Sequence, residues 1–233
     1  MHRHTLRLSA LLFGLLTSLS LHAQLGDLRN NFSIGFGGGI NMSSVSFNPS
    51  VKQNSLSGIQ GGLCARYISE RWFKMLCGAQ VEINFSQRGW SEFYKDYPTL
   101  VYQRKMNYME IPFLAHLAFG KEKGLQFFVH LGPQIGFFLS DSETQSGDWN
   151  APANDNINIE TTQHSKPLDT KFDYGIVGGG GIELRTKIGN FQAEGRYYYA
   201  LSDFFDNTKK GYFGRSAHNV IGIRIAYLFD LAK

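Results

Sequence analysis

The feature that most constrains the fold is a two-residue alternation of apolar and polar side chains, which recurs in eight stretches. They are 32–42, 58–68, 73–86, 101–119, 125–140, 171–186, 191–202 and 216–229. In the fifth stretch, Leu125, Phe127 and Val129 share one face. Gln126 and His130 lie on the other face. Because successive side chains of a β-strand point to opposite faces, this period predicts eight strands.

The connections between these stretches alternate between short and long. The short ones are 69–72, 120–124 and 187–190, and the long ones are 43–57, 87–100, 141–170 and 203–215. Each stretch can cross a bilayer as a tilted strand of about 9–11 residues. Tight turns at one end and long loops at the other are typical of membrane barrels, because only a closed ring pairs every backbone group in lipid. The sequence therefore predicts an all-β fold, an eight-stranded antiparallel up-and-down transmembrane β-barrel.

The alternative is a secreted eight-stranded carrier barrel, which would be apolar inside and polar outside. The polar faces here carry both charge signs and many glycines. This composition favours a packed ionic interior over an apolar ligand pocket. The mean hydropathy of −0.22 is compatible with a membrane barrel, since half of each strand and all loops are polar.

Aromatic residues, which make up 14% of the chain, gather near both ends of the stretches. Those near the short turns are Trp72, Phe73, Phe119, Phe191 and Phe229. Those near the long loops are Trp90, Tyr94, Tyr102, Phe138, Phe204, Phe205, Tyr212 and Phe213. Membrane barrels carry such rings at both interfaces, so we expect two lipid-facing aromatic girdles.

The first 23 residues have the pattern of a signal peptide. The basic start MHRHTLR precedes the apolar run LSALLFGLLTSLSL and a small-residue cleavage site at Ala23. An uncleaved membrane anchor is the alternative. We predict a signal peptide at 1–23 and an outer-membrane barrel domain at 24–233, with periplasmic termini and extracellular long loops. Cleavage would remove Arg3 and Arg7 and lower the formal net charge from +4 to +2, which argues against a nucleic-acid partner.

The polar faces, assigned to the lumen, carry four cations and four anions. They are Arg66, Arg185, Arg196 and Arg224, with Glu82, Glu110, Glu183 and Glu194. The interior of an eight-stranded barrel is only wide enough for its own side chains. Isolated charges there would be costly, so we expect a network of ion pairs that holds the barrel closed.

One pair of carboxylates allows a second interpretation. The expected turn at 187–190 places Glu183 opposite Glu194, and like charges in that position are unfavourable. Arg185 and Arg196 lie on the diagonals and can neutralise them. The alternative to this structural network is a proton-binding site.

No residue pattern predicts a metal, a cofactor or a catalytic nucleophile. His116 and His130 share a face on adjacent strands, but the expected turn places Phe128 opposite His116, and no third ligand is evident. The glycine runs GFGGGIN and GIVGGGGIE lack the Lys-Ser/Thr of a phosphate loop. We therefore expect a non-enzymatic protein.

Cys64 and Cys77 flank the first short turn. The expected register places Cys64 opposite Leu76 and points Cys77 to lipid. A bridge would require a slip of the register, so we predict two free thiols.

The segment NYMEIPFLAHLAFG, residues 107–120, contains a proline on the polar face. The expected register places Glu110 opposite Gln134, and Pro112 opposite Gly132 and beside Pro133. Proline has no N–H to donate to a β-ladder. Pro112 and Pro133 at one level of neighbouring strands therefore predict a shared local bulge or kink.

Three motifs extend the argument to a family. FSQRGW (85–90), NYMEIPFLAHL (107–117) and FFVHLGPQIGFFLS (127–140) resemble the PorT-like outer-membrane β-barrel family of Bacteroidetes-type bacteria. The family's aromatic-x-Glu-Ile-Pro motif is matched by Tyr108, Glu110, Ile111 and Pro112, with His116 at its basic end. Its Gly-Pro is matched by Gly132 and Pro133.

The resemblance implies an accessory or assembly role in type IX secretion, the export of surface proteases and adhesins. It implies outer-membrane lipid and other secretion-system proteins as partners, and it supplies no catalytic residues. Two alternatives remain open: a surface adhesin or ligand-binding barrel that uses the 141–170 loop, and a lipid-modifying outer-membrane enzyme. A conducting pore is disfavoured by the filled lumen.

Overall fold

The computed structural model describes residues 27–121, 123–150, 159–208 and 211–232, so the predicted signal peptide lies outside the described residues. The strands are β1 (Asp27–Asn48), β2 (Gln53–Asn54), β3 (Leu56–Trp72), β4 (Met75–Phe93), β5 (Val101–Gly120), β6 (Gly124–Ser146), β7 (Phe172–Arg185), β8 (Asn190–Ala200) and β9 (Arg215–Ala232). Each of the eight long strands overlaps one of the eight alternating stretches. In the described part of the chain, no helix is long and apolar enough to cross a membrane.

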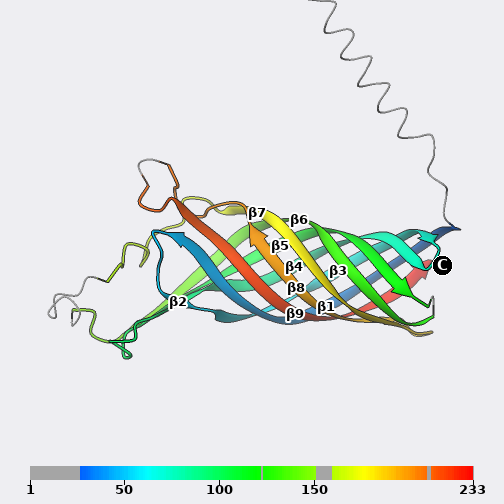
Figure 1. Ribbon diagram of the computed structural model, residues 1–233, viewed down its shortest axis with the longest axis horizontal. Helices are drawn as coiled ribbons and strands as arrows, with labels where there is room; N and C mark the ends of the chain where they lie inside the picture. Colours follow the sequence, from blue (N-terminus) through cyan, green and yellow to red (C-terminus); the bar gives the residue numbers. More distant parts are fainter. Residues whose placement is uncertain (1–26, 122, 151–158, 209–210, 233) are drawn as a thin grey trace, which may run out of the picture.

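The eight long strands form a closed antiparallel ring. Neighbours along the chain are neighbours in the ring from β3 to β9, and β1 pairs with both β3 and β9 to complete it. The short β2 pairs with β4 at the end of the ring. The long connections gather at one end, and the first and last strands begin and finish at the other (Figure 1). The predicted eight-stranded up-and-down barrel is confirmed.

The two faces of the wall carry opposite kinds of side chain. Along β8, burial alternates at every residue. Gln192 and Glu194 point inward and are 2% and 3% exposed, whereas Phe191 and Tyr197 point outward and are 42% and 47% exposed. An apolar exterior around a polar interior is the inverse of a soluble carrier barrel, and that alternative is therefore rejected.

The strands are longer than the alternation alone predicted. β4 continues to Phe93 and β6 continues to Ser146, where polar residues still pair with the start of β5. The long loops are correspondingly shorter than expected. The strand ladder thus projects beyond the apolar belt, because hydrogen bonding between strands does not depend on the polarity of the side chains.

The first short turn lies later than expected. The predicted turn at 69–72 belongs to β3, and the turn consists of Phe73 and Lys74, with Phe73 at a φ of +50°. In the actual register Cys64 pairs with Glu82, and Cys77 pairs with Glu70. The expected Cys64–Leu76 pairing is wrong. Both cysteines are free thiols.

Candidate functional site: the closed lumen

Arg196 on β8 joins two carboxylates across the lumen. Its Nη1 and Nη2 donate to the two oxygens of Glu82 at 2.8 and 3.0 Å. Its Nε and Nη2 donate to the two oxygens of Glu194 at 3.1 and 2.8 Å. Arg224 Nη1 lies 3.6 Å from Glu82 Oε1. All four side chains are buried, so one guanidinium balances two carboxylates that have little access to water.

A second group surrounds Glu183, nearer the short turns. Arg66 of β3 donates to Glu183 of β7 across the barrel. Gln192 Nε2 donates to the same carboxylate at 2.8 Å, and Arg185 Nε lies 3.8 Å from it. The ion pair between Arg66 and Glu183 thus connects β3 with β7, which are not neighbours in the ring.

The prediction that Glu183 lies opposite Glu194 is wrong. Glu183 lies opposite Gln192, and Glu194 lies opposite Gly181. The turn occupies 186–189, where Thr186 N–H donates to the Gly189 carbonyl, and it moves the pairing by two residues. The two carboxylates therefore belong to separate ion-pair groups.

A third group contains two charges that the sequence analysis missed, Arg88 and Asp173. Arg88 Nη2 donates to Asp173 Oδ2 at 2.6 Å, and its Nη1 lies 3.3 Å from Glu110 Oε1. The guanidinium carbon of Arg88 lies 3.7 Å from the centroid of the Tyr108 ring. Tyr198 OH donates to Asp173 Oδ2 at 2.7 Å. Glu110 thus pairs with an arginine outside the predicted set.

A signal for Arg88 was present in the sequence. Arg88 lies an even number of positions, six, after Glu82, so the two residues share a face of one strand. The segment 87–100 was instead assigned to a loop, whereas β4 extends to Phe93. Asp173 lies second in β7, inside the predicted stretch 171–186, and it has the same parity as Glu183, so the alternation already placed it on the lumenal face.

The β5–β6 register also differs from the expected one by two residues. His116 lies opposite His130, and Glu110 lies opposite Gly136 and not Gln134. The connection at 121–123 is flanked by Gly120 and Gly124, both with positive φ, at +138° and +111°. Such backbone conformations are open to glycine, and they set where the two strands begin to pair.

The two histidines are consequently in direct contact. His116 Nδ1 and His130 Nε2 are 2.8 Å apart, and His130 Nδ1 lies 3.0 Å from Glu194 Oε1. A hydrogen-bonded series thus runs from His116 to the carboxylate that Arg196 holds. Among the residues that the structure describes, no group of three or more His, Cys, Asp or Glu side chains could hold a metal ion.

The β-ladders on both sides of β5 are interrupted around Pro112. With β4, pairing is missing between Val81↔Phe113 and Asn84↔Glu110. With β6, it is missing between Pro112↔Gln134 and Ala115↔Leu131. The register is the same before and after each gap, so the distortion is an interruption without an inserted residue. Pro112 lies opposite Gln134, and the expected pairing with Gly132 is wrong.

An aromatic cap closes the lumen under the long loops. Its buried residues are Val45, Phe47, Val51, Trp90, Tyr102, Met106, Tyr108, Phe204, Phe205 and Phe213, with Phe138, Trp149 and Leu168 packed against them. Trp90 stacks on Phe204 with ring centroids 6.0 Å apart, and Phe205 stacks on Phe213 at 5.5 Å. The cap fills the space that the ion pairs leave open.

The cap corrects the prediction of a second girdle. Five of the eight aromatic residues assigned to it point inward and are at most 5% exposed: Trp90, Tyr102, Phe204, Phe205 and Phe213. Outward rings at this end are instead Phe137, Phe172, Tyr174, Tyr197 and Tyr199. The girdle residues predicted near the short turns are exposed, with Phe119 at 44% and Phe229 at 46%.

Glu92 anchors the longest loop to this cap. Its carboxylate accepts hydrogen bonds from Trp90 Nε1 at 3.0 Å and from Tyr94 OH at 2.8 Å, and both residues are close to Glu92 in the sequence. Gln163 Nε2 and His164 Nε2, both from the loop after β6, lie 2.9 and 2.7 Å from its oxygens. The described part of this loop is therefore folded back over the barrel mouth.

The filled lumen leaves little free space. A cavity of about 20 Å³ lies among Asn41, Gln60, Glu110, Gln134 and Arg196. That volume holds about one water molecule. The buried ion pairs around this cavity are suited to holding the wall rigid.

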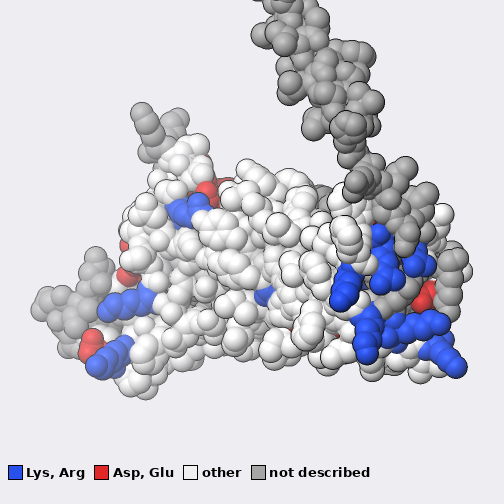
Figure 2. Space-filling model, turned by 45° about the vertical axis from the view of Figure 1, so that its right-hand side comes forward, with Lys and Arg blue, Asp and Glu red and all other residues white. Residues whose placement is uncertain are grey.

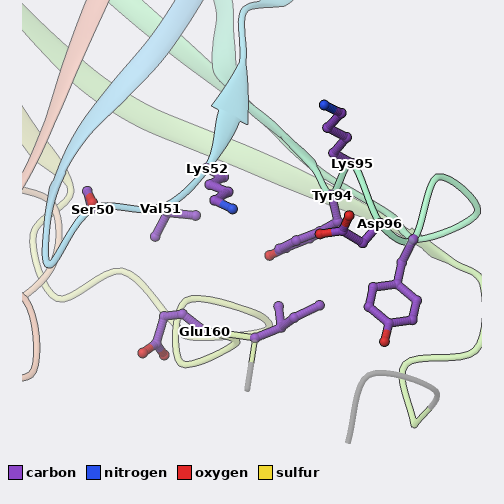
Figure 3. Close-up of a pocket in the computed structure, with 9 residues that line it drawn as sticks. Ser50, Val51, Lys52, Tyr94, Lys95, Asp96 and Glu160 are labelled. Atoms are coloured by element: carbon purple, nitrogen blue, oxygen red, sulfur yellow. The ribbon is translucent and has the colours of Figure 1, made fainter. Parts of the chain in front are cut away.

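A separate hollow of about 200 Å³ opens between the long loops (Figure 3). Tyr94 projects into the space between the segment with Val51 and Lys52 and the segment with Glu160 (Figure 3). Burial tends to raise the pKa of Glu160, but hydrogen bonds from Thr162 and Tyr212 outweigh it and lower the pKa. The hollow thus combines an aromatic ring with charges of both signs.

A closed ring of strands with an apolar exterior and an ionic interior defines a transmembrane β-barrel protein. The sequence matches the family model of the outer membrane protein beta-barrel domain over residues 22–206. The chain belongs to this family, and its place is the bacterial outer membrane.

The chain is similar, at low sequence identity, to several solved structures of outer-membrane proteins. OprG from Pseudomonas aeruginosa is 13% identical, with a TM-score of 0.46 over 88% of this chain and 98% of OprG. Ail from Yersinia pestis, in complex with the heparin analogue sucrose octasulfate, is 13% identical, with a TM-score of 0.39 over 86% of this chain and 100% of Ail. Neisserial surface protein A is 12% identical, with a TM-score of 0.40 over 85% of this chain and 97% of that protein. The search of curated protein sequences gave no significant match.

Proposed function

We propose that this protein is a non-enzymatic accessory or assembly component of type IX protein secretion, with its termini in the periplasm and its long loops outside the cell. The observation that carries the proposal is the closed lumen. Ion pairs fill its middle and an aromatic cap fills its mouth. A barrel of this kind acts through its surfaces and not as a conduit.

The motif around Pro112 supports the secretion role through the resemblance to PorT-like barrels. Tyr108 and Glu110 of that motif both contact Arg88, which lies in the FSQRGW motif. Two of the three family motifs therefore meet at one ion-pair group inside the barrel. Such a contact gives a physical reason for the motifs to occur together.

The proposal is tested by deleting the gene in the source bacterium. Surface proteases and adhesins carried by the secretion system should disappear from the cell surface and accumulate inside, and plasmid-borne protein should restore them. Uptake of a dye that the outer membrane normally excludes should stay unchanged, because loss of the protein opens no pore. Normal surface delivery of cargo in the deletion strain would reject the proposal.

The hollow in Figure 3 favours a second candidate, a surface barrel that binds a ligand through its loops. Replacing residues 147–169 with a short Gly-Ser linker separates the two candidates, because β6 ends at Ser146 and the wall stays intact. A secretion factor with the shortened loop should still restore cargo export. Cells that export cargo normally but no longer adhere to host or matrix surfaces would identify the adhesin instead.

Lipid modification is the enzymatic alternative. Mass spectrometry of lipid A and phospholipids from the deletion strain should give the wild-type profile. A lipid species that is lost with the gene and returns with the plasmid would contradict a non-enzymatic role.

A further inference from the structure

The end of the barrel with the short turns is basic. The Lys and Arg residues of the described chain at this end are Arg29, Arg71, Lys74, Lys121, Lys123, Arg185 and Lys187, and the acidic residues are Asp27, Glu70 and Asp230. Lys and Arg gather visibly at this end, whereas both signs are mixed at the other (Figure 2). The charge of the barrel is therefore unequal along its axis.

A hollow of about 450 Å³ lies within this basic end. Arg29, Lys123, Arg185, Lys187, Asn190 and Asp230 are among its lining residues. They come from β1, the β5–β6 turn, the β7–β8 hairpin and β9, so the hollow lies along one side of the ring, where these strands are consecutive neighbours. Arg185, whose Nε also lies 3.8 Å from Glu183 Oε1, is joined there by the exposed lysines Lys123 and Lys187, which add positive charge to the hollow.

The floor of the hollow is held in place by hydrogen bonds. Asn190 is fully buried, and its Nδ2 donates to Asp230 Oδ1 at 2.6 Å. Ser33 Oγ donates to the same oxygen at 2.7 Å. Arg185 Nε donates to Asn190 Oδ1 at 3.3 Å. The guanidinium is thus positioned before any ligand arrives, which reduces the entropy lost on binding.

We propose that this hollow is a docking site for an acidic segment of a periplasmic polypeptide, with its carboxylates held by Arg185, Lys123 and Lys187. The planar guanidinium of arginine fits a carboxylate in a two-point contact, and lysine adds positive charge around it. The volume admits a few side chains of a peptide. The inference rests on the proposed orientation, in which the short turns face the periplasm.

The location of the hollow favours a polypeptide over an anionic lipid. Asn190 and Arg185 lie on the inward face of the wall, within the ring of strands. A headgroup whose chains remain in the surrounding bilayer would have to cross the rim of the barrel to reach them. A flexible segment from the aqueous side meets no such barrier.

The test uses the full barrel in nanodiscs of phosphatidylcholine. The probe is a fluorescein-labelled peptide of alternating Glu and Gly, and the measurement is fluorescence polarisation. Binding should be saturable and should weaken as salt increases, because the contacts are charge pairs. A peptide with Gln in place of Glu should not bind, and equal binding of the two peptides would overturn the proposal.

Two variants with the same loss of charge locate the site. Lys123→Gln with Lys187→Gln removes two exposed lysines of the hollow and should weaken binding about tenfold or more. Lys52→Gln with Lys95→Gln removes two lysines at the loop end and should leave binding unchanged. Equal weakening by both variants would overturn the site. Loss of peptide binding to the wild-type barrel in nanodiscs that contain phosphatidylglycerol would assign the site to lipid headgroups instead.

A labelling experiment separates this inference from the proposed orientation. In a chain with Cys64→Ser and Cys77→Ser, Lys187→Cys provides a single thiol at the β7–β8 turn. Protection from an impermeant maleimide in intact cells, with labelling after permeabilisation, supports the periplasmic placement. Labelling in intact cells overturns the orientation itself. Protection combined with absent peptide binding overturns the docking site alone.

Discussion

Between the levels of Glu183 and Asp173 the lumen is filled by ion pairs, whereas the mouth under the long loops is filled by aromatic rings. Ion pairs are directional, and each charge depends on a specific partner. Aromatic packing is less directional, and its contribution follows the apolar area that is buried. Substitutions in the middle of the barrel should therefore change the free energy of unfolding by amounts that depend on which partner charges remain. Substitutions in the mouth should lower it in proportion to the side-chain volume that is removed.

The sharpest test of coupling is Arg196→Met, which leaves Glu82 and Glu194 without their shared cation. Breaking a buried pair on one side costs about 3–5 kcal/mol, so we expect that loss in the free energy of unfolding. Urea titration in lipid vesicles, followed by tryptophan fluorescence, provides the measurement.

Two controls define this test. Arg215→Gln, near the loop end, should cost about 1 kcal/mol or less, as partly exposed charged contacts do. The triple change Glu82→Gln, Glu194→Gln and Arg196→Met should recover part of the loss, since it removes Arg196 together with both of its carboxylates and leaves only Arg224 without the nearby Glu82 carboxylate. A triple variant less stable than Arg196→Met would contradict the coupling.

The graded response of the mouth is tested at Phe213, which is fully buried in the aromatic cap. Phe213→Ala should cost about 3 kcal/mol, because a buried ring is replaced by a cavity. Phe213→Leu retains much of the volume and should cost about 1 kcal/mol. The same urea titrations measure both variants. Equal losses in the free energy of unfolding for the two variants would argue against a stability of the cap that depends on the volume of the buried side chain.

Two neighbouring glycines compare the inside of the wall with the outside. A Cβ at Gly179 would lie 2.7 Å from Glu194 Oε1 and 2.7 Å from the Gly195 carbonyl oxygen. A Cβ at Gly178 would meet Leu131 Cδ1 at 3.4 Å, an ordinary contact. We expect Gly179→Ala to destabilise by about 1–3 kcal/mol through overpacking. Gly178→Ala should change stability by about 1 kcal/mol or less and in the stabilising direction, since it restricts the unfolded chain. Equal effects would refute the inward placement of residue 179.

The smallest expected effect concerns the two thiols. Cys64 pairs with Glu82 and Cys77 with Glu70, so their side chains lie at different levels of the wall. Mild oxidation of the folded barrel should change neither its electrophoretic mobility nor its unfolding midpoint. Recovery of a crosslinked 64–77 fragment by non-reducing peptide mapping would mean that the β3–β4 register is different.

Alternation was sufficient to predict the number of strands and the face of each residue. It identified Arg66, Glu183 and Arg196 as lumenal, because the parity of a residue within a strand decides its side of the wall. It did not determine which residues lie opposite one another. That depends on turn conformation, and glycines such as Gly120 or a residue such as Phe73 with positive φ shift the pairing.

The aromatic residues near the loops show a further limit. Trp90 has the same parity as Glu82 and could have been assigned to the lumen, yet proximity to a loop was taken as evidence of a lipid interface. Phe204, Phe205 and Phe213 follow or precede strands, so parity gives no side for them. Their burial results from loops that fold back over the mouth, a tertiary arrangement without a local sequence signal.

Closure of the ring depends on β9, which follows the other seven long strands in the sequence and pairs with β1. Ser33 on β1 donates to Asp230 on β9, 197 positions further on. Until β9 is present, the remaining strands have two unpaired edges with free N–H and C=O groups, and such edges bind other chains. A nascent or truncated polypeptide lacking residues 215–232 is therefore an open sheet. Its two edges stay open to pairing with other chains until β1 and β9 meet.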